Sequence, residues 1–368
     1  MNNQINSNRL IFSESIKYNA IDKELKSDNK QCNRSEHKPV QMSSLNLVAN
    51  FVPFLGKYKI IDAHGHINLT DKAANSYKKF GKDELTPDSI NKAVNVPNPP
   101  GQDELEITHV AISNLTGLYA DSHNPGEPSI ISPKEASILA MKVCKDQNEK
   151  SKPHFLALLS CDPNPSINKY GNVNQRLKDI EELILSPDNK FYGLKFHPYH
   201  NNTDANSGYY DKYMELARKY DLPCFFHCAP DEHSNPLKTI ELAKKYSDVP
   251  VILYHINLAS DMYHYDQAVE KASDAINNDG ANIYLELSWV DNLDRVMKAI
   301  RDAGEDRVIF GTDTSLGPMA DPVLYRERII SIMNKIRETY NKDKAEEIIQ
   351  KIFFENSKKI FKLENTDK

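Results

Sequence analysis

From Tyr58 onward, short apolar runs alternate with longer stretches that have helical spacing. The apolar runs are rich in β-branched and aromatic residues and lack a strict polar–apolar alternation, which is typical of parallel strands buried on both faces. The eight runs are 58–66, 107–114, 154–162, 191–198, 223–230, 250–257, 282–288 and 307–313. This pattern predicts eight buried parallel strands.

The stretches between the runs repeat apolar residues three and four positions apart, which indicates amphipathic helices. They cover 132–147, 172–185, 209–220, 237–246, 265–276, 292–303, 322–340 and 345–361. The first begins with Ser132 and Pro133, and Glu135 stands three residues after the serine, which is a capping-box pattern. Helices that alternate with eight strands predict a (β/α)8 TIM barrel.

The rival fold is an open doubly wound sheet, which normally carries a Gly-rich phosphate-binding turn after its first strand. Here the first run ends in His64-Gly65-His66 instead. We therefore expect a barrel over residues 56–366, with a long insertion after its first strand at 67–106. A segment of that length at the C-terminal end of a barrel strand is expected to be a lid or a substrate-binding loop.

The first 55 residues precede the barrel pattern and form an N-terminal extension. Residues 1–44 are polar and rich in Asn, Ser and Lys, which predicts a flexible segment. Residues 45–55, LNLVANFVPFL, are apolar enough to pack on another surface. We expect them to cover one end of the barrel, and the alternative is that they bind a partner.

Composition narrows the class of protein. The 368 residues are 39% hydrophobic, and no stretch approaches the ~20 apolar residues that span a bilayer. A formal net charge of −6 argues against binding to nucleic acid through phosphate contacts. The N-terminus lacks the basic and apolar regions of a secretory signal, and five cysteines are an odd, sparse set. We expect free thiols and a cytoplasmic enzyme that acts on a small-molecule substrate. The sequence leaves open whether the enzyme is a homo-oligomer.

Residues with catalytic chemistry stand at the ends of the predicted strands. They are His64, His66, Lys195, His197, His227, His255 and Asp313, so five of the 12 histidines lie there. In a barrel the C-terminal ends of the strands converge on one rim, where active sites form. Imidazole nitrogens with a carboxylate suit zinc or a similar divalent ion, which can lower the pKa of bound water to about 7.

Residue spacing supports this cluster, although each member also has a purely structural explanation. His64 and His66 are two apart and share one face of a strand, and such a pair beside an aspartate is costly to bury without a purpose. His197 is either a substrate contact or a packing residue. Asp313 could instead cap the following helix, and Lys195 could form a buried ion pair.

These motifs resemble the amidohydrolase superfamily, specifically the amidohydrolase-related (amidohydrolase 2) metal-dependent hydrolases. The resemblance runs from about Tyr58 to Leu363 and rests on IIDAHGH, GLKFHP, FFHCA, VILYH, FGTD and FFENSKKIF, in the order and phase of the strands. Residues 1–55 lie outside it. The resemblance implies that His64 and His66, together with Asp313, hold the more buried metal.

The resemblance leaves two metal layouts open. Lys195 matches the lysine that is carboxylated and bridges two metals in binuclear members, where His227 and His255 are expected on the second ion. In mononuclear members this role of the lysine is absent, and His227 joins the first three ligands on one ion. His255 is then expected to transfer protons.

The implied reaction is hydrolysis of an amide, lactone or ester-like bond. The metal would polarise the substrate carbonyl and supply hydroxide, Asp313 would accept a proton from water and return it to the leaving group, and His255 would assist. Some relatives are non-oxidative decarboxylases, which is the alternative, although Lys195 favours hydrolysis. A barrel that binds a ligand without catalysis is a third hypothesis.

Overall fold

The computed structural model describes residues 56–69, 85–120, 122, 124–150, 152–258, 262–314 and 316–363. The chain divides into two units, residues 1–53 and 54–368, and all the described residues belong to the second. The predicted roles of the N-terminal extension, the state of Cys32 and residues 70–84 of the predicted insertion lie outside the described residues. The four described cysteines are free, as predicted, and the structure shows that they are buried.

The strands of the described region are all parallel to their neighbours and follow the order of the chain. They are β1 (Lys57–Ile67), β2 (Glu104–Asn114), β3 (His154–Ala157), β4 (Leu159–Ser160), β5 (Leu194–Phe196), β6 (Cys224–His227), β7 (Val251–Tyr254), β8 (Ile283–Glu286) and β9 (Val308–Ile309). β3 pairs with β2, and β4 pairs with β5. Leu158 between them donates its amide to Ile112 O at 2.9 Å, so β3 and β4 are two pieces of one barrel strand.

Hydrogen bonds just beyond β9 join the last strand to the first. The Ala63 amide donates to Phe310 O at 3.1 Å, and the His66 amide donates to Thr314 O at 2.7 Å. The Thr314 amide donates back to His64 O at 3.1 Å. The eight strand positions of the described chain therefore close into a ring, which confirms the predicted (β/α)8 barrel.

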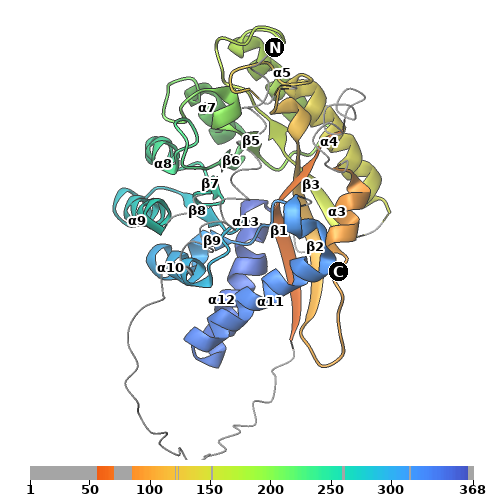
Figure 1. The fold of residues 1–368 in the computed structure, drawn as a ribbon. Helices are drawn as coiled ribbons and strands as arrows, with labels where there is room; N and C mark the ends of the chain where they lie inside the picture. The colour runs from red at the N-terminus through yellow and green to blue at the C-terminus, as the bar shows by residue number, and fades with distance from the viewer. Residues whose placement is uncertain are drawn as a thin grey trace, which may run out of the picture. The chain divides into compact units, whose positions relative to one another are not determined.

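Helices surround the strands (Figure 1). They are α3 (Pro87–Val94), α4 (Pro133–Asn148), α5 (Val173–Leu185), α6 (Pro198–Asn201), α7 (Asp211–Tyr220), α8 (Pro236–Lys245), α9 (Met262–Asp279), α10 (Leu293–Ala303), α11 (Pro322–Thr339), α12 (Lys342–Gln350) and α13 (Asn356–Ile360). Short turns of 3-10 helix are η1 (Leu115–Gly117), η2 (Glu305–Arg307) and η3 (Gly317–Ala320), and η4 (Lys351–Glu355) is a π-helix. Each helix among the described residues is too short or too polar to cross a lipid bilayer.

Two of these helical features differ from the sequence prediction. The helix α3 lies within the segment predicted only as an insertion, and a capping box between Thr86 and Ser89 begins it. The predicted helix 345–361 is three segments, because the π-helix η4 separates α12 from α13. The capping serine predicted for α4 is present, since the Ser132 side chain accepts a hydrogen bond from the Glu135 amide.

Apolar side chains fill two layers. One lies between the strands and the surrounding helices, and the other lies inside the ring of strands. The inner layer includes Ala63, Leu156, Ile252 and Ile309, together with Phe361 just after α13. The Phe361 ring stacks on that of Phe225, with centroids 5.5 Å apart. The inside of the ring of strands is therefore a packed core.

Candidate metal centre

Three potential metal-ligand atoms converge near the C-terminal end of β1. Two belong to residues of β1, and the third belongs to a residue that follows β9. His64 Nε2 and His66 Nε2 lie 3.0 Å apart. Asp313 Oδ1 lies 3.4 Å from the first and 3.0 Å from the second. Ligands about 2.0–2.1 Å from a tetrahedral zinc ion lie roughly 3.4 Å from one another. All three side chains are buried, so this spacing matches a metal site and is otherwise costly.

The backbone around these residues is irregular. The pairing of β1 with β2 shifts register between Asp62 and Gly65, which brackets His64. Such a bulge redirects side chains and is common beside active sites. Asp313 has a φ of +62°, a left-handed conformation that few residues adopt without compensation. The chain is therefore bent at both points that supply the converging atoms.

Hydrogen bonds on the far side of each imidazole orient the two histidines. His64 Nδ1 lies 3.3 Å from Glu286 Oε2 and 3.2 Å from Ser288 Oγ. His66 Nδ1 lies 2.8 Å from Ser113 Oγ. With Nδ1 engaged, each Nε2 lone pair is free to face a metal, which is the usual arrangement around metal-binding histidines. A second candidate group, of His64 with His255 and Glu286, uses the Nδ1 side, and we assign it to orientation.

The hydrogen bonding and the protonation of these ligand atoms also suit a divalent cation. Asp313 Oδ1 is buried and accepts no hydrogen bond within the described part of the chain. Burial also lowers the pKa of His64 well below its usual value, which keeps the ring neutral and its lone pair available. A cation at this point would satisfy an oxygen that the protein leaves without a donor.

His227 and His255 lie together on the same rim. His227 Nδ1 is 3.2 Å from His255 Nε2, and His255 Nδ1 is 2.7 Å from Ser288 Oγ. The Ser288 hydroxyl donates to Glu286 Oε2 at 2.6 Å. The amide of His255 donates to the same carboxylate at 3.0 Å. A continuous chain of hydrogen-bonding groups thus leads from His227 to a fully buried carboxylate.

Lys195 and His197 occupy two further places on this rim. Lys195 Nζ lies 4.0 Å from the centroid of the Tyr254 ring, and that ring stacks on His64 with centroids 3.6 Å apart. Burial lowers the pKa of Lys195 to about 7. The His197 ring stacks on His227, with centroids 3.9 Å apart. All seven residues predicted from strand ends therefore gather at one end of the barrel, and their roles stay predictions.

Asp62 ties the two converging strands together. Its Oδ1 accepts from the amides of His64 and Thr312, both at 3.0 Å. Its Oδ2 accepts from Thr312 Oγ1 at 2.5 Å and from the Tyr325 hydroxyl of α11 at 2.7 Å. Because the carboxylate contacts the residue before Asp313, it fixes both sides of the metal group.

Sequence reasoning missed Asp62, Ser113, Glu286, Ser288 and Trp289. Four of them stand at or just after a predicted strand end, as the histidines do, so the same positional rule would have found them. Asp62 has a different signal in the sequence. It precedes His64 by two residues, and residues two apart in a strand point to the same face.

Glu286 makes the stability of the metal-free protein depend on pH. Burial raises the pKa of Glu286 from 4.5 to about 7. The stability that its protonated form provides is present below pH 4.5 and is lost as the pH rises through 7. Relative to Glu286→Gln, the free energy of unfolding of the native sequence should fall by about 2–3 kcal/mol over this interval. Urea denaturation of both proteins in the presence of a chelator measures this change. If the free energy of unfolding of the native sequence rose with pH relative to that of Glu286→Gln, the raised pKa of Glu286 would be wrong.

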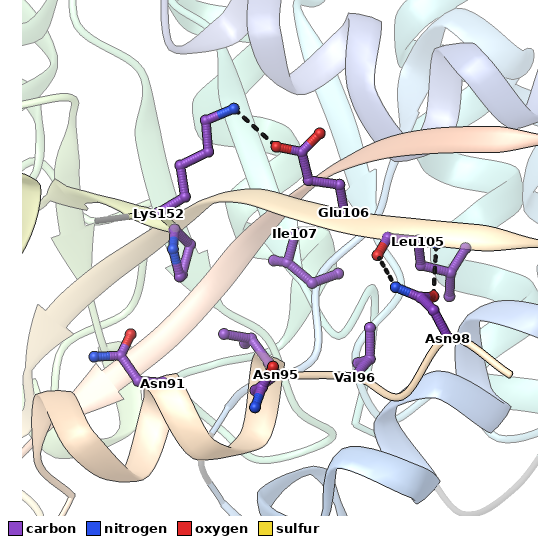
Figure 2. Close-up of a pocket in the computed structure, with 10 residues that line it drawn as sticks. Asn91, Asn95, Val96, Asn98, Leu105, Glu106, Ile107 and Lys152 are labelled. Atoms are coloured by element: carbon purple, nitrogen blue, oxygen red, sulfur yellow. Dashed lines mark hydrogen bonds and ion pairs between the residues drawn. The ribbon is translucent and has the colours of Figure 1, made fainter.

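A hollow of about 450 Å³ is lined by none of the rim residues. Figure 2 shows its lining side chains. Asn91, Asn95, Asn98, Glu106 and Lys152 line it, from α3, the segment after it and the beginnings of β2 and β3. Lys152 Nζ pairs with Glu106 Oε1 at 2.8 Å, and the Asn98 side chain bonds the Leu105 backbone. The residues that line it include none of the converging histidines and aspartate, so it is not where we place the chemistry.

Solved structures of similar fold include 5-carboxyvanillate decarboxylase LigW from Sphingomonas paucimobilis, at 13% identity and a TM-score of 0.52 over 83% of this chain and 99% of that one. Another is dihydroxybenzoic acid decarboxylase from Polaromonas sp. JS666 with bound manganese and 2-nitroresorcinol. It is 14% identical, with a TM-score of 0.54 over 83% of this chain and 97% of that one. A third is a probable 2-pyrone-4,6-dicarboxylic acid hydrolase from Acinetobacter baumannii with citric acid bound. It is 13% identical, with a TM-score of 0.53 over 82% of this chain and 99% of that one. At these identities the likeness concerns the fold.

A search of curated proteins gave no match. The family model described as amidohydrolase matches residues 180–363, which is half of the 368-residue chain. The match begins within α5 and includes the strand ends that carry Lys195, His227, His255 and Asp313. Together with the barrel and the converging histidines of β1, it shows that the chain belongs to the amidohydrolase family.

Proposed function

We propose that this chain is a metal-dependent hydrolase that cleaves an amide, lactone or ester-like bond in a small molecule. The observation that carries the proposal is the convergence of His64 Nε2, His66 Nε2 and Asp313 Oδ1 beside the His227–His255 pair. Hydrolysis needs a site that activates water and a route for the released proton, and these two features supply one each.

The metal would be held by His64, His66 and Asp313, with His227 as a further ligand from β6. Two imidazoles and a carboxylate are a donor set that zinc accepts, and manganese is present in one structure of the same fold. A divalent ion there would polarise a carbonyl oxygen and lower the pKa of water. We favour one ion, because Lys195 Nζ, which would carry the bridging group of a two-metal site, packs over the Tyr254 ring.

The proton route begins at Asp313 and His255. Asp313 accepts a proton from water and returns it to the leaving group. His255 holds a proton at Nε2 or Nδ1, and a positive charge on its ring is compensated through Ser288 Oγ by the Glu286 carboxylate. His197, stacked on His227, is placed to contact the substrate.

Non-oxidative decarboxylation is the second candidate. It is favoured by the decarboxylases among the solved structures of this fold, including the manganese-bound one from Polaromonas. The two reactions differ in what they release. We would incubate the manganese- or zinc-loaded protein with lactones, esters and amides, and separately with hydroxybenzoates, in water enriched in oxygen-18. A product acid with one solvent oxygen supports hydrolysis, whereas carbon dioxide release without solvent oxygen in the organic product supports decarboxylation.

Metal content separates the two proposed layouts. Protein purified without added metal or chelator should hold one divalent ion per chain, and Lys195→Ala should hold the same, because Lys195 Nζ packs over Tyr254 rather than among the converging atoms. Elemental analysis of both proteins measures this. Two ions that fall to one or none in the variant would instead indicate a carboxylated Lys195 bridging two metals. Absence of metal after supplementation would leave the ligand-binding barrel as the remaining hypothesis.

A further inference from the structure

Trp289, the single tryptophan of the chain, stands at the edge of the proposed metal site. Its indole Nε1 donates a hydrogen bond to Asp313 Oδ2 at 2.7 Å. The residue is nevertheless 40% exposed. Its polar atom therefore reaches into the site, while part of its surface faces solvent at the rim where the strands end.

The backbone at Trp289 is in a costly conformation that its surroundings enforce. Its φ is +58°, which is unusual for a bulky residue. The turn that contains it is closed by the Val290 amide, which donates to Leu287 O at 3.3 Å. The Arg328 guanidinium, from α11, donates to the carbonyls of both Leu287 and Val290. Strain of this kind persists where neighbouring contacts over-determine the backbone, and it clusters at functional sites.

This geometry decides which oxygen of Asp313 is available to a metal. With Oδ2 occupied by the indole N–H, Oδ1 is the oxygen left facing His64 and His66. A carboxylate fixed in this way presents one oxygen at a defined angle. Partners that orient metal ligands typically contribute 10- to 100-fold in affinity.

We propose that Trp289 is a positioning residue that turns Asp313 Oδ1 toward the metal and offers its exposed ring to a flat apolar group of the substrate. The first half concerns metal binding by this chain, and the second rests on the proposed function. Tyr199 and Leu258, which follow β5 and β7, are 37% and 38% exposed. Because the strand ends share one rim, the mouth of the site carries apolar side chains on several of its sides.

Metal affinity tests the positioning role without any need for turnover. Trp289→Phe keeps a ring and removes the N–H donor, and we expect it to bind Zn²⁺ about 10- to 100-fold more weakly in a competition titration with a chromophoric chelator. Tyr199→Leu, on the same rim, should bind Zn²⁺ as the native protein does. Equal affinity of the native protein and Trp289→Phe would overturn the proposal.

A spectroscopic measurement on the native chain covers the case in which Trp289→Phe does not fold. The intrinsic tryptophan emission comes from this residue alone, so Zn²⁺ added to chelator-treated protein should change the emission with the same dissociation constant as the direct titration. Emission that stays constant up to saturating Zn²⁺ would overturn the proposal. If the native protein binds no metal at all, both this inference and the proposed function are wrong.

The substrate contact has its own readout in metal-saturated enzymes. Trp289→Phe should retain the KM of the native enzyme more closely than Trp289→Leu, because only the former keeps a flat ring at the mouth. A common KM for the two variants would remove the substrate contact. Hydrolysis lacking in the native enzyme, with the Zn²⁺ results intact, would instead refute the proposed function and leave the positioning role standing.

Discussion

Replacing Asp313 with Asn should lower turnover by about 10²- to 10⁴-fold, because the substitution removes a proton acceptor whose contribution is typically of that size. The amide keeps the shape of the side chain and retains an oxygen, so Trp289 Nε1 can still be paired. The fold should therefore survive, with an unchanged circular dichroism spectrum. Turnover is measured at saturating metal, and bound metal is quantified in the same samples.

Asp321→Asn is the matched control for this variant. Asp321 caps α11 through its side chain, and Asn caps helices about as well as Asp. The control should have native turnover. Native turnover in Asp313→Asn at full metal occupancy would remove Asp313 from the mechanism, whereas turnover lost together with the metal would show that it acts as a ligand.

Replacing Asp62 with Ala should lower the free energy of unfolding by about 3–5 kcal/mol, because each buried donor left without an acceptor costs about 1–3 kcal/mol. The carboxylate accepts four hydrogen bonds, from the His64 amide, the amide and hydroxyl of Thr312, and the Tyr325 hydroxyl. These donors are buried, and alanine leaves them without their acceptor. Urea denaturation in the presence of a chelator isolates this effect from that of bound metal.

Tyr325→Phe provides the comparison, since it removes one of the four donors and keeps the ring in place. We expect it to cost about 1 kcal/mol, the usual net value of one hydrogen bond. A loss in Asp62→Ala no greater than that in Tyr325→Phe would show that Asp62 does not hold the two strands together. Metal affinity should fall in Asp62→Ala and stay near native in Tyr325→Phe.

Most of the fold could be predicted from the sequence because the barrel strands are continuous apolar runs and the helices between them are amphipathic. The helix α3 could not, because it lies in a polar stretch and its cap pairs Thr86 with Ser89 rather than with an acidic residue. The break at η4 could not either, because the apolar stripe continues through the π-helix. The spacing of apolar residues predicts which face of a helix is buried, but it does not predict a local change from α-helix to π-helix.

The candidate site was predictable to the extent that it depends on position along a strand. His227 is the last residue of β6 and Asp313 follows β9 by four residues, and the closed barrel brings such positions together. The orientation of each side chain was not predictable in this way. The bond from Trp289 to Asp313 depends on two left-handed backbone conformations, and the bonds to Asp62 come from segments distant in sequence.

The closure of the ring through Asp62 and Thr312 joins residues 250 positions apart in the sequence. During synthesis His64 and His66 emerge from the ribosome well before Asp313 and the helix that supplies Tyr325. Contacts of such long range form late in folding because the entropy of closing the loop must be overcome first. The proposed metal-binding site is therefore assembled only after Asp313 and Tyr325 have been made, so a chain that ends before Asp313 lacks the carboxylate of the site and competes poorly for the ion.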